Sequence, residues 1–597
     1  MTARNGSPPE DHLVPDSACA WTLPPGAGWT ASDALLDALE HCGVTHLYVN
    51  LGSDHPELIE SLAKRAASGH HPFRVVTCPH ENVALTAAQA HAMVSGQPQA
   101  VFVHVDVGTQ TLGGALHNAF RARVPVFIFA GETPFTLNGE LLGSRNRPAQ
   151  ILQDVPDQHS VVRAYVKWSM SVRTGRNIRD LVYRGMQLAR SEPCGVVYLS
   201  GAREVMSEAL DGPATDQVSC WPALTPSALP PVMAREIAEA VSQARKPVLI
   251  TSYFGRRPER VAALVRMAER VGIMVVEESP VYLNFPRSHP LHAGYLAAEV
   301  VSDADLILVV DCDVPWINAT IRLSEGVRIY QIDTDPLKES IPLWHVPARA
   351  FSQADSALAL EQIEGVLDRL PNDDARVVER TRVAAMRHAE IETRAKARLQ
   401  RSVATLNPDS VAACLAGLLD DDAIVIDETV TSSMMVLESL PRDKPGTYLA
   451  SGGSSLGFGG GGSIGARLAA PERTVVCLTG DGSYLFGVPS AVHIVAARYR
   501  APFLTVIMNN GGWNATKQNL LRLRPDGYAQ RDDRLWVGFG QEADLAGIAA
   551  AAGRALALTV REPDQLEPLL RQALEAVRGG QCAVVDVRLP PITLQDP

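Results

Sequence analysis

The sequence has no long apolar stretch, no paired-cysteine motif and no excess of basic residues. None of its uninterrupted apolar runs approaches the ~18 residues that a membrane-spanning helix needs. Lys and Arg (54) are outnumbered by Asp and Glu (66), which gives a net charge of -12. Nucleic-acid-binding domains usually carry a basic face. We therefore expect a protein that contacts neither a membrane nor nucleic acid.

The nine cysteines are scattered, with no C-x-x-C pair and no repeated spacing. We interpret them as buried small hydrophobic residues in a reducing compartment. The N-terminal residues 1–28 are polar and acidic, and no basic region leads into an apolar one. They therefore do not resemble a secretory signal. We expect a disordered tail and a cytoplasmic location.

The remaining chain alternates short apolar runs with helix-length stretches. Runs such as QAVFVHVDV and VPVFIFAG, bounded by Gly and Pro, are typical of strands in a buried parallel sheet. A Pro-rich stretch near residue 225 and a charged helical stretch near residue 385 interrupt this alternation. At 597 residues the chain is also too long for one hydrophobic core. We predict an α/β fold of three doubly wound parallel-sheet domains. The predicted boundaries are 29–205, 232–370 and 403–597 for the domains, 206–231 for a linker and 371–402 for a helical linker.

The strongest local signal is Gly480-Asp481-Gly482, followed by Asn509-Asn510. Both segments come directly after strand-like runs, so they lie at the carboxyl ends of strands, where open α/β sheets bind ligands. An Asp carboxylate and an Asn carbonyl are the hard oxygen donors that Mg²⁺ prefers. Gly482 and Ser483 open the next predicted helix, where free N–H groups can hold phosphate.

With this combination, the sequence resembles the thiamine-diphosphate enzyme family that includes acetolactate synthase, benzoylformate decarboxylase and pyruvate decarboxylase. The resemblance runs from about Thr30 to the C-terminus. It implies that Asp481, Asn510 and the Gly512 carbonyl bind Mg²⁺, which holds the cofactor diphosphate. The three domains would then be a pyrimidine-binding, a central and a diphosphate-binding domain.

Two further segments resemble cofactor-binding parts of that family. Ser451–Phe458 is similar to the segment that precedes the metal motif, and its Leu456 would support the bent cofactor from below. Asp427–Ser432 resembles another such segment, with Thr429 and Thr431 near the diphosphate. Gly480, Gly482 and Ser483 complete the expected cofactor contacts.

The second half of the expected site is Cys78-Pro-His-Glu-Asn82, between a strand-like run and a helical stretch. In the family a Glu at this place hydrogen-bonds N1′ of the aminopyrimidine. A carboxylate there stabilises the imino tautomer, whose N4′ takes the proton from the thiazolium C2. The resemblance therefore assigns this role to Glu81.

The family resemblance also implies an assembly. Glu81 and Asp481 would come from different subunits, with the cofactor between them. We therefore expect at least a homodimer, and a homotetramer as a dimer of dimers.

Three residues are candidates for contacting the substrate. Leu51-Gly-Ser53-Asp is similar to a P-G-S-N segment of benzoylformate decarboxylase, and Val103-His104 resembles another segment of that enzyme. A serine can bind a substrate carboxylate, and a histidine can relay protons near neutral pH. By the same resemblance we consider Ser53, His104 and His289 as catalytic residues.

Other positions depart from an aromatic pocket. The stretch from Trp513 to Asn519, which includes Thr516, is polar, and Glu132 stands where several relatives have Gln. A carboxylate in place of an amide changes the charge offered to an anionic 2-oxo acid. An aliphatic or polar 2-oxo acid is therefore at least as good a candidate as benzoylformate.

The resemblance implies decarboxylation of a 2-oxo acid, with the resulting enamine either protonated to an aldehyde or captured by a second carbonyl. Three alternatives stay open. They are acetolactate-type condensation of two 2-oxo acids, a 2-hydroxyacyl-CoA lyase using Arg256-Arg257 for phosphates, and a non-catalytic cofactor-binding relative. Relatives bind FAD, ADP or nothing in the central domain, and the sequence does not decide between these.

Overall fold

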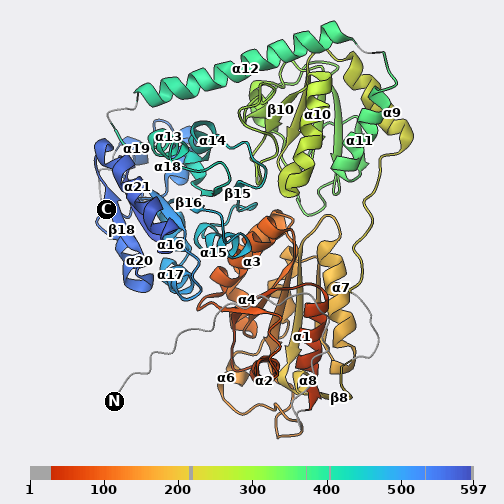
Figure 1. Ribbon diagram of the computed structural model, residues 1–597, viewed down its shortest axis with the longest axis vertical. Helices are drawn as coiled ribbons and strands as arrows, with labels where there is room; N and C mark the ends of the chain where they lie inside the picture. Colours follow the sequence, from red (N-terminus) through yellow and green to blue (C-terminus); the bar gives the residue numbers. More distant parts are fainter. Residues whose placement is uncertain (1–27, 214–219, 372, 402–404, 532, 593–597) are drawn as a thin grey trace.

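The computed structural model describes residues 28–213, 220–371, 373–401, 405–531 and 533–592. It has three α/β domains, each built on its own parallel sheet (Figure 1). This confirms the predicted fold class. The tail expected over residues 1–28 lies, apart from residue 28, outside the described residues.

The first domain contains a parallel sheet in the order β3-β2-β4-β5-β7-β6. Its strands are β2 (His46–Asn50), β3 (Arg74–Thr77), β4 (Gln99–Val103), β5 (Val126–Glu132), β6 (Trp168–Val172) and β7 (Val196–Ala202), and a two-residue antiparallel pair, β1 (Trp29–Thr30) with β8 (Ala209–Leu210), accompanies it. Its helices are α1 (Ala31–His41), α2 (Pro56–Ala67), α3 (Glu81–Ser95), α4 (Asp106–Thr111), α5 (Gly113–Arg121), α6 (Ala149–Leu152), α7 (Ile178–Arg190) and α8 (Arg203–Met206).

The central domain contains a parallel sheet in the order β10-β9-β11-β12-β13. Its strands are β9 (Pro247–Thr251), β10 (Met274–Glu277), β11 (Leu306–Val310), β12 (Arg328–Asp333) and β13 (Ala350–Gln353), and its helices are α9 (Pro231–Gln243), α10 (Val261–Val271) and α11 (Ser356–Leu367).

The C-terminal domain contains a parallel sheet in the order β15-β14-β16-β17-β19-β18. Its strands are β14 (Ile424–Glu428), β15 (Tyr448–Ala450), β16 (Val475–Gly480), β17 (Leu504–Asn509), β18 (Leu556–Val560) and β19 (Ala583–Arg588). Its helices are α13 (Pro408–Ala416), α14 (Ser433–Ser439), α15 (Gly459–Ala469), α16 (Asp481–Phe486), α17 (Pro489–Arg498), α18 (Asn514–Leu523), α19 (Tyr528–Arg531), α20 (Leu545–Gly553) and α21 (Leu566–Arg578).

The central strands of each sheet are buried and largely apolar because helices cover both faces. In β4, β9, β11 and β14 every residue is buried. A strand buried on both faces reads as a continuous apolar run and shows no alternation. The core therefore lies within the three sheets, and the polar residues collect where the strands end.

Helices α3 and α15 join the first and C-terminal domains, and glycines allow them to approach closely. A Cβ on Gly465 would lie 1.9 Å from the Ala87 carbonyl oxygen, and one on Gly461 would lie 2.0 Å from Thr86 Oγ1. Larger residues at these two places in α15 would push the helices apart. The glycine-rich run at the start of α15 therefore serves packing.

The long helix α12 (Asp374–Arg401) runs from the central domain to the C-terminal domain (Figure 1). Its Arg380 donates hydrogen bonds to the carbonyl oxygens of Val241, Ser242 and Ala244, at the end of α9, and of Val271, at the end of α10. A guanidinium there satisfies carbonyls that have no partner inside their own helices. No helix among the described residues is long and apolar enough to cross a membrane.

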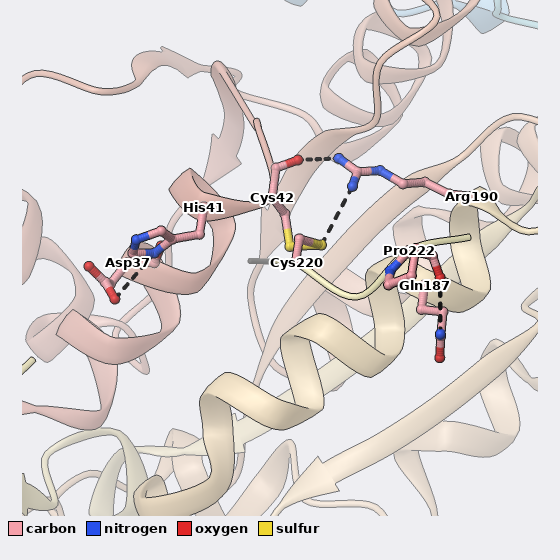
Figure 2. Close-up of a disulfide and its surroundings, with 7 residues drawn as sticks. All are labelled: Asp37, His41, Cys42, Gln187, Arg190, Cys220 and Pro222. Carbon is pink, nitrogen blue, oxygen red and sulfur yellow. Dashed lines mark hydrogen bonds and ion pairs between the residues drawn. A yellow bond between two sulfur atoms is a disulfide. The ribbon is translucent and has the colours of Figure 1, made fainter. Parts of the chain in front are cut away.

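Two cysteines contradict the interpretation of all nine as unpaired buried residues. Cys42, at the end of α1, forms a disulfide with Cys220 in the segment after the first domain (Figure 2). That segment returns along α7, where Gln187 donates to the Pro222 carbonyl and Arg190 contacts both cysteines. The chain path thus brings together two thiols that are far apart in sequence. The described unpaired cysteines are Cys78, Cys194, Cys312, Cys414, Cys477 and Cys582.

Candidate active site

Glu81 lies at the carboxyl edge of the first sheet, as the first residue of α3. It is 8% exposed, and its Oε1 accepts a hydrogen bond of 2.9 Å from Asn50 Nδ2, at the end of β2. The preceding residue, His80, caps the helix by accepting from Asn82 N. The edge of the sheet therefore presents a buried carboxylate whose other oxygen can accept from a ligand.

His104 and Asp54 stand beside this glutamate. His104 follows β4, and its Nδ1 contacts Asp54 Oδ1 in the loop after β2. A Cβ on Gly108 would lie 3.1 Å from Glu81 Oε1 and 3.0 Å from His104 Cβ, which places the two side chains around the same point. The hydrogen bond to Asp54 raises the pKa of His104, against the opposing effect of burial. The structure thus brings predicted residues Glu81 and His104 together.

Ser53 and Glu132 lie at the same edge. Ser53 is exposed next to Asp54, in the loop after β2. Glu132 ends β5, and its carboxylate accepts from Ser200 Oγ at 2.6 Å, with His159 Nε2 3.6 Å away. Burial opposes its ionisation, but hydrogen bonds from His159, Ser171 and Ser200 hold the pKa of Glu132 below its usual range. Glu132 therefore stays ionised within a polar cluster.

A second cluster lies at the carboxyl edge of the C-terminal sheet. Asp481 begins α16 after β16, and Asn510 and Gly512 follow β17. The Gly512 N–H donates to Asp481 Oδ2 at 3.0 Å and to Asn510 Oδ1 at 3.2 Å, and the Gly482 N–H donates to Asp481 Oδ1 at 2.9 Å. One backbone amide thus holds a carboxylate and an amide oxygen side by side.

The donor set of this cluster is one carboxylate with neutral oxygens. The described residues contain no group of three or more His, Cys, Asp or Glu that could hold a metal ion. Zinc and similar metals usually need such a group, whereas Mg²⁺ takes few protein ligands and completes its shell with phosphate and water. Asp481, Asn510 and the Gly512 carbonyl therefore fit Mg²⁺ with a bound diphosphate.

Small residues and an indole shape the second cluster. A Cβ on Gly482 would lie 2.3 Å from the Trp513 ring, so the indole lies directly over this glycine. Trp513 also packs against Phe539, and its side chain is 39% exposed. Gly480 precedes α16, Ser483 is buried within its first turn, and Thr516 is exposed on α18. Trp513 therefore lies over the cluster, and Thr516 follows it on the exposed helix α18.

The segment after β14 supplies the remaining predicted cofactor residues. Thr431 Oγ1 accepts from Asn514 Nδ2 at 3.2 Å, next to the Gly512 turn, whereas Thr429 donates its hydroxyl to Asp427 at 2.7 Å. Leu456 is half-buried. The carbonyl of its neighbour Gly457 accepts from Asn82 Nδ2 at 3.0 Å. This hydrogen bond joins the residue after Glu81 to the residue after Leu456. Thr431 is thus next to the second cluster, whereas the described side-chain partners of Thr429 are Asp427 and Ser433.

Sequence reasoning missed Glu428, whose carboxylate lies at the start of α15. It accepts three backbone N–H groups, from Gly457 at 2.6 Å, Phe458 at 2.9 Å and Gly459 at 2.8 Å. Burial raises the pKa of Glu428 to about 7, although its three donors act in the opposite direction. The sequence signal that could have found Glu428 was its place directly before Thr429. Its three donors belong to the glycine-rich start of α15, further along the chain.

His289 is not brought to either cluster by a described contact. It lies in the central domain, where its Nε2 is 3.1 Å from Glu269 Oε1 of α10 and its ring packs on Phe285. Its suggested catalytic role stays a prediction.

The central sheet does not fit a dinucleotide at its switch point, the crevice between β9 and β11. The N–H groups of Ser252 and Tyr253 both donate to the Asp311 carbonyl, and the Gly255 N–H donates to Asn284. The following side chain, Arg256, is buried between Asp311 and Glu192. A pyrophosphate would need these donors. Because they are used within the chain, FAD or ADP has no built site there.

Comparison with known proteins agrees with this arrangement. Family models of thiamine pyrophosphate enzymes match residues 29–161 (N-terminal TPP binding domain), 234–363 (central domain) and 428–587 (C-terminal TPP binding domain). Benzoylformate decarboxylase of Pseudomonas aeruginosa is 26% identical over 82% of this chain and 87% of its own length. The large subunit of acetolactate synthase isozyme 1 of Escherichia coli is 23% identical over 73% of this chain and 75% of its own length.

The fold is also shared with a solved structure. A thiamine diphosphate-dependent 4-hydroxybenzoylformate decarboxylase of Rhodococcus jostii superposes with a TM-score of 0.75 at 21% identity, over 94% of this chain and 99% of that one. Since the family models match all three domains in order, the chain belongs to the thiamine pyrophosphate enzyme family.

Proposed function

We propose that the protein decarboxylates a 2-oxo acid with thiamine diphosphate and Mg²⁺, and releases or ligates the aldehyde product. The observation that carries this proposal is the carboxylate of Glu81, fixed by Asn50 beside His104 at the edge of the first sheet. When bound, the cofactor supplies a nucleophilic carbon and an electron sink for the electrons that CO₂ leaves behind.

The residues of this chain have separable roles in the proposal. Glu81 accepts a hydrogen bond from the aminopyrimidine and so sets the proton balance of the cofactor. Asp481, Asn510 and the Gly512 carbonyl hold Mg²⁺, and Thr431, Gly482 and Ser483 lie where a diphosphate would bind. Ser53 and His104 contact the substrate carboxylate, since His104 lies beside Glu81 and the exposed Ser53 adjoins Asp54, which contacts His104.

Glu81→Gln tests the central role. The amide keeps the shape of the side chain but removes the negative charge, so decarboxylation should fall by about a hundredfold or more. The measurement is CO₂ release from a panel of short aliphatic, branched, cationic and aromatic 2-oxo acids, with thiamine diphosphate and Mg²⁺ added. The exposed Glu567→Gln on α21 serves as the control. Full activity in Glu81→Gln would reject the proposal.

The same panel separates the alternatives. Acetolactate formed from pyruvate would indicate the condensation of two 2-oxo acids, and free aldehyde alone would indicate simple decarboxylation. The CoA alternative is disfavoured, because Arg256 is engaged by Asp311 and Glu192 and Arg257 alone faces solvent nearby. Cofactor binding without turnover of any acid would favour the non-catalytic alternative.

We also propose that the active protein is at least a homodimer. Large apolar side chains are exposed in the two domains that carry the site, among them Leu142 (77%) and Leu152 (84%) in the first domain and Tyr528 (85%) and Trp536 (77%) in the C-terminal domain. Exposed apolar surface, where it is contiguous, usually marks an interface. A second copy that covers both faces would bring the Glu81 edge of one chain to the Asp481 edge of the other.

A further inference from the structure

The buried carboxylate of Asp54, next to His104, has no role in the proposal so far. Asp54 is 5% exposed, and its Oδ2 accepts the Val105 N–H at 2.9 Å while its Oδ1 contacts His104 Nδ1. His55 Nδ1 lies 3.2 Å from the same Oδ1. Burying an ionised carboxylate is costly unless it is paired and hydrogen-bonded. Here both oxygens have partners.

Two glycines leave the space that this pair occupies. A Cβ on Gly131, in β5, would lie 1.5 Å from Asp54 Oδ2, and a Cβ on Gly52 would lie 2.0 Å from His104 Nδ1. Neither glycine could be replaced without displacing the carboxylate or the imidazole. The ends of β2, β4 and β5 thus form a cradle around the Asp54–His104 pair.

The two partners differ in their access to the site. The Asp54 side chain is 4% exposed, whereas that of His104 is 22% exposed, and His104 shares its surroundings with Glu81. A purely structural ion pair gives no reason for the imidazole to lie beside the one glutamate that the cofactor needs. The arrangement matches the logic of a carboxylate that orients a catalytic histidine.

We propose that Asp54 is a positioning residue: its carboxylate holds the Nδ1–H of His104, so that Nε2 is the nitrogen that exchanges protons with an anionic substrate. This inference rests on the proposed function. The imidazolium first attracts the carboxylate of a 2-oxo acid. After CO₂ has left, Nε2–H donates its proton to the substrate carbon that carried the carboxylate. Solvent then returns a proton to Nε2.

The charges around His104 determine its titration. Asp54 and Glu81 favour the protonated ring, the Gln153 amide also supports it, and His55 contacts the same Asp54 oxygen as His104 does. The pKa of His104 is therefore raised, and the acid form persists to higher pH than in an unpaired histidine. Removing the Asp54 charge should lower this pKa and move the alkaline limb of the activity profile to lower pH.

Asp54→Asn tests the proposal, because the amide keeps the size of the side chain and removes its charge. We expect the alkaline limb of kcat/KM to move down by about one pH unit or more. The value of kcat/KM near neutral pH should fall by about tenfold to a hundredfold. In a His104→Gln background, Asp54→Asn should cause no further shift. The exposed Glu392→Gln, which removes a carboxylate beside His388 on α12, is the matched control.

A second readout does not depend on turnover. In the unsubstituted protein, ¹⁵N NMR of labelled histidine should show His104 with its proton on Nδ1 in the neutral form, and a pKa that Asp54→Asn lowers. An unchanged pH profile and NMR titration in folded Asp54→Asn would overturn the proposal, as would an equal shift without His104. If no 2-oxo acid is decarboxylated, the proposed function fails, but the NMR titration still decides whether Asp54 holds His104.

Discussion

At the scale of single residues, Glu428 links the acidity of one carboxyl group to the stability of a domain. Burial raises its pKa from 4.5 to about 7 in the folded protein. The native state therefore binds more protons than the unfolded chain between about pH 4.5 and pH 7, so stability declines as pH rises through this window. The effect is about 1.4 kcal/mol for each unit of displacement.

Glu428→Gln should abolish this dependence, because an amide does not titrate. We expect the apparent melting temperature of the wild-type protein to fall between about pH 5 and about pH 7.5 more steeply than that of the variant. Differential scanning calorimetry at several pH values measures this, with the exposed Glu567→Gln as the control. Parallel curves for Glu428→Gln and the wild type would contradict the assignment.

At the scale of elements, the disulfide fixes the end of α1 to the segment that leaves the first domain. Cys42 and Cys220 are 178 residues apart in sequence, so the bond closes a long loop and restricts the unfolded chain. Cys220→Ser should lower the stability of the first domain by about 2–4 kcal/mol. Cys414→Ser, at an unpaired half-buried cysteine, is the control. Urea unfolding with and without reductant checks this: equal stability in both conditions would refute it.

At the scale of the whole molecule, the exposed apolar faces predict self-association. Leu152→Asp places a charge in the proposed interface, so the dimer should dissociate at about tenfold higher protein concentration or more. Activity per chain should fall on dilution in step with the mass measured by light scattering. Val378→Asp, at a residue 67% exposed on α12, should leave the mass unchanged. A Leu152→Asp protein of unchanged mass would remove this face from the interface.

The sequence predicted what depends on local pattern. Apolar runs predicted the three parallel sheets, and position directly after strands predicted Asp481 and Asn510 as ligand-binding residues, whereas the roles of Glu81 and Gly512 were implied by the family resemblance. Pairings between distant segments were out of reach. Asp54 meets His104 across 50 residues, and Glu428 meets its donors across 29 to 31. The Cys42–Cys220 bond likewise depends on a returning segment that no local motif marks.

The same bond makes most of the first domain a covalent ring. The loop after α2, with the exposed residues Ser68 and Gly69, lies within that ring, where a protease can reach the backbone. A single cut there opens the ring but does not release a fragment. The two pieces would migrate together on a gel run without reductant and separate only after the sulfurs are reduced.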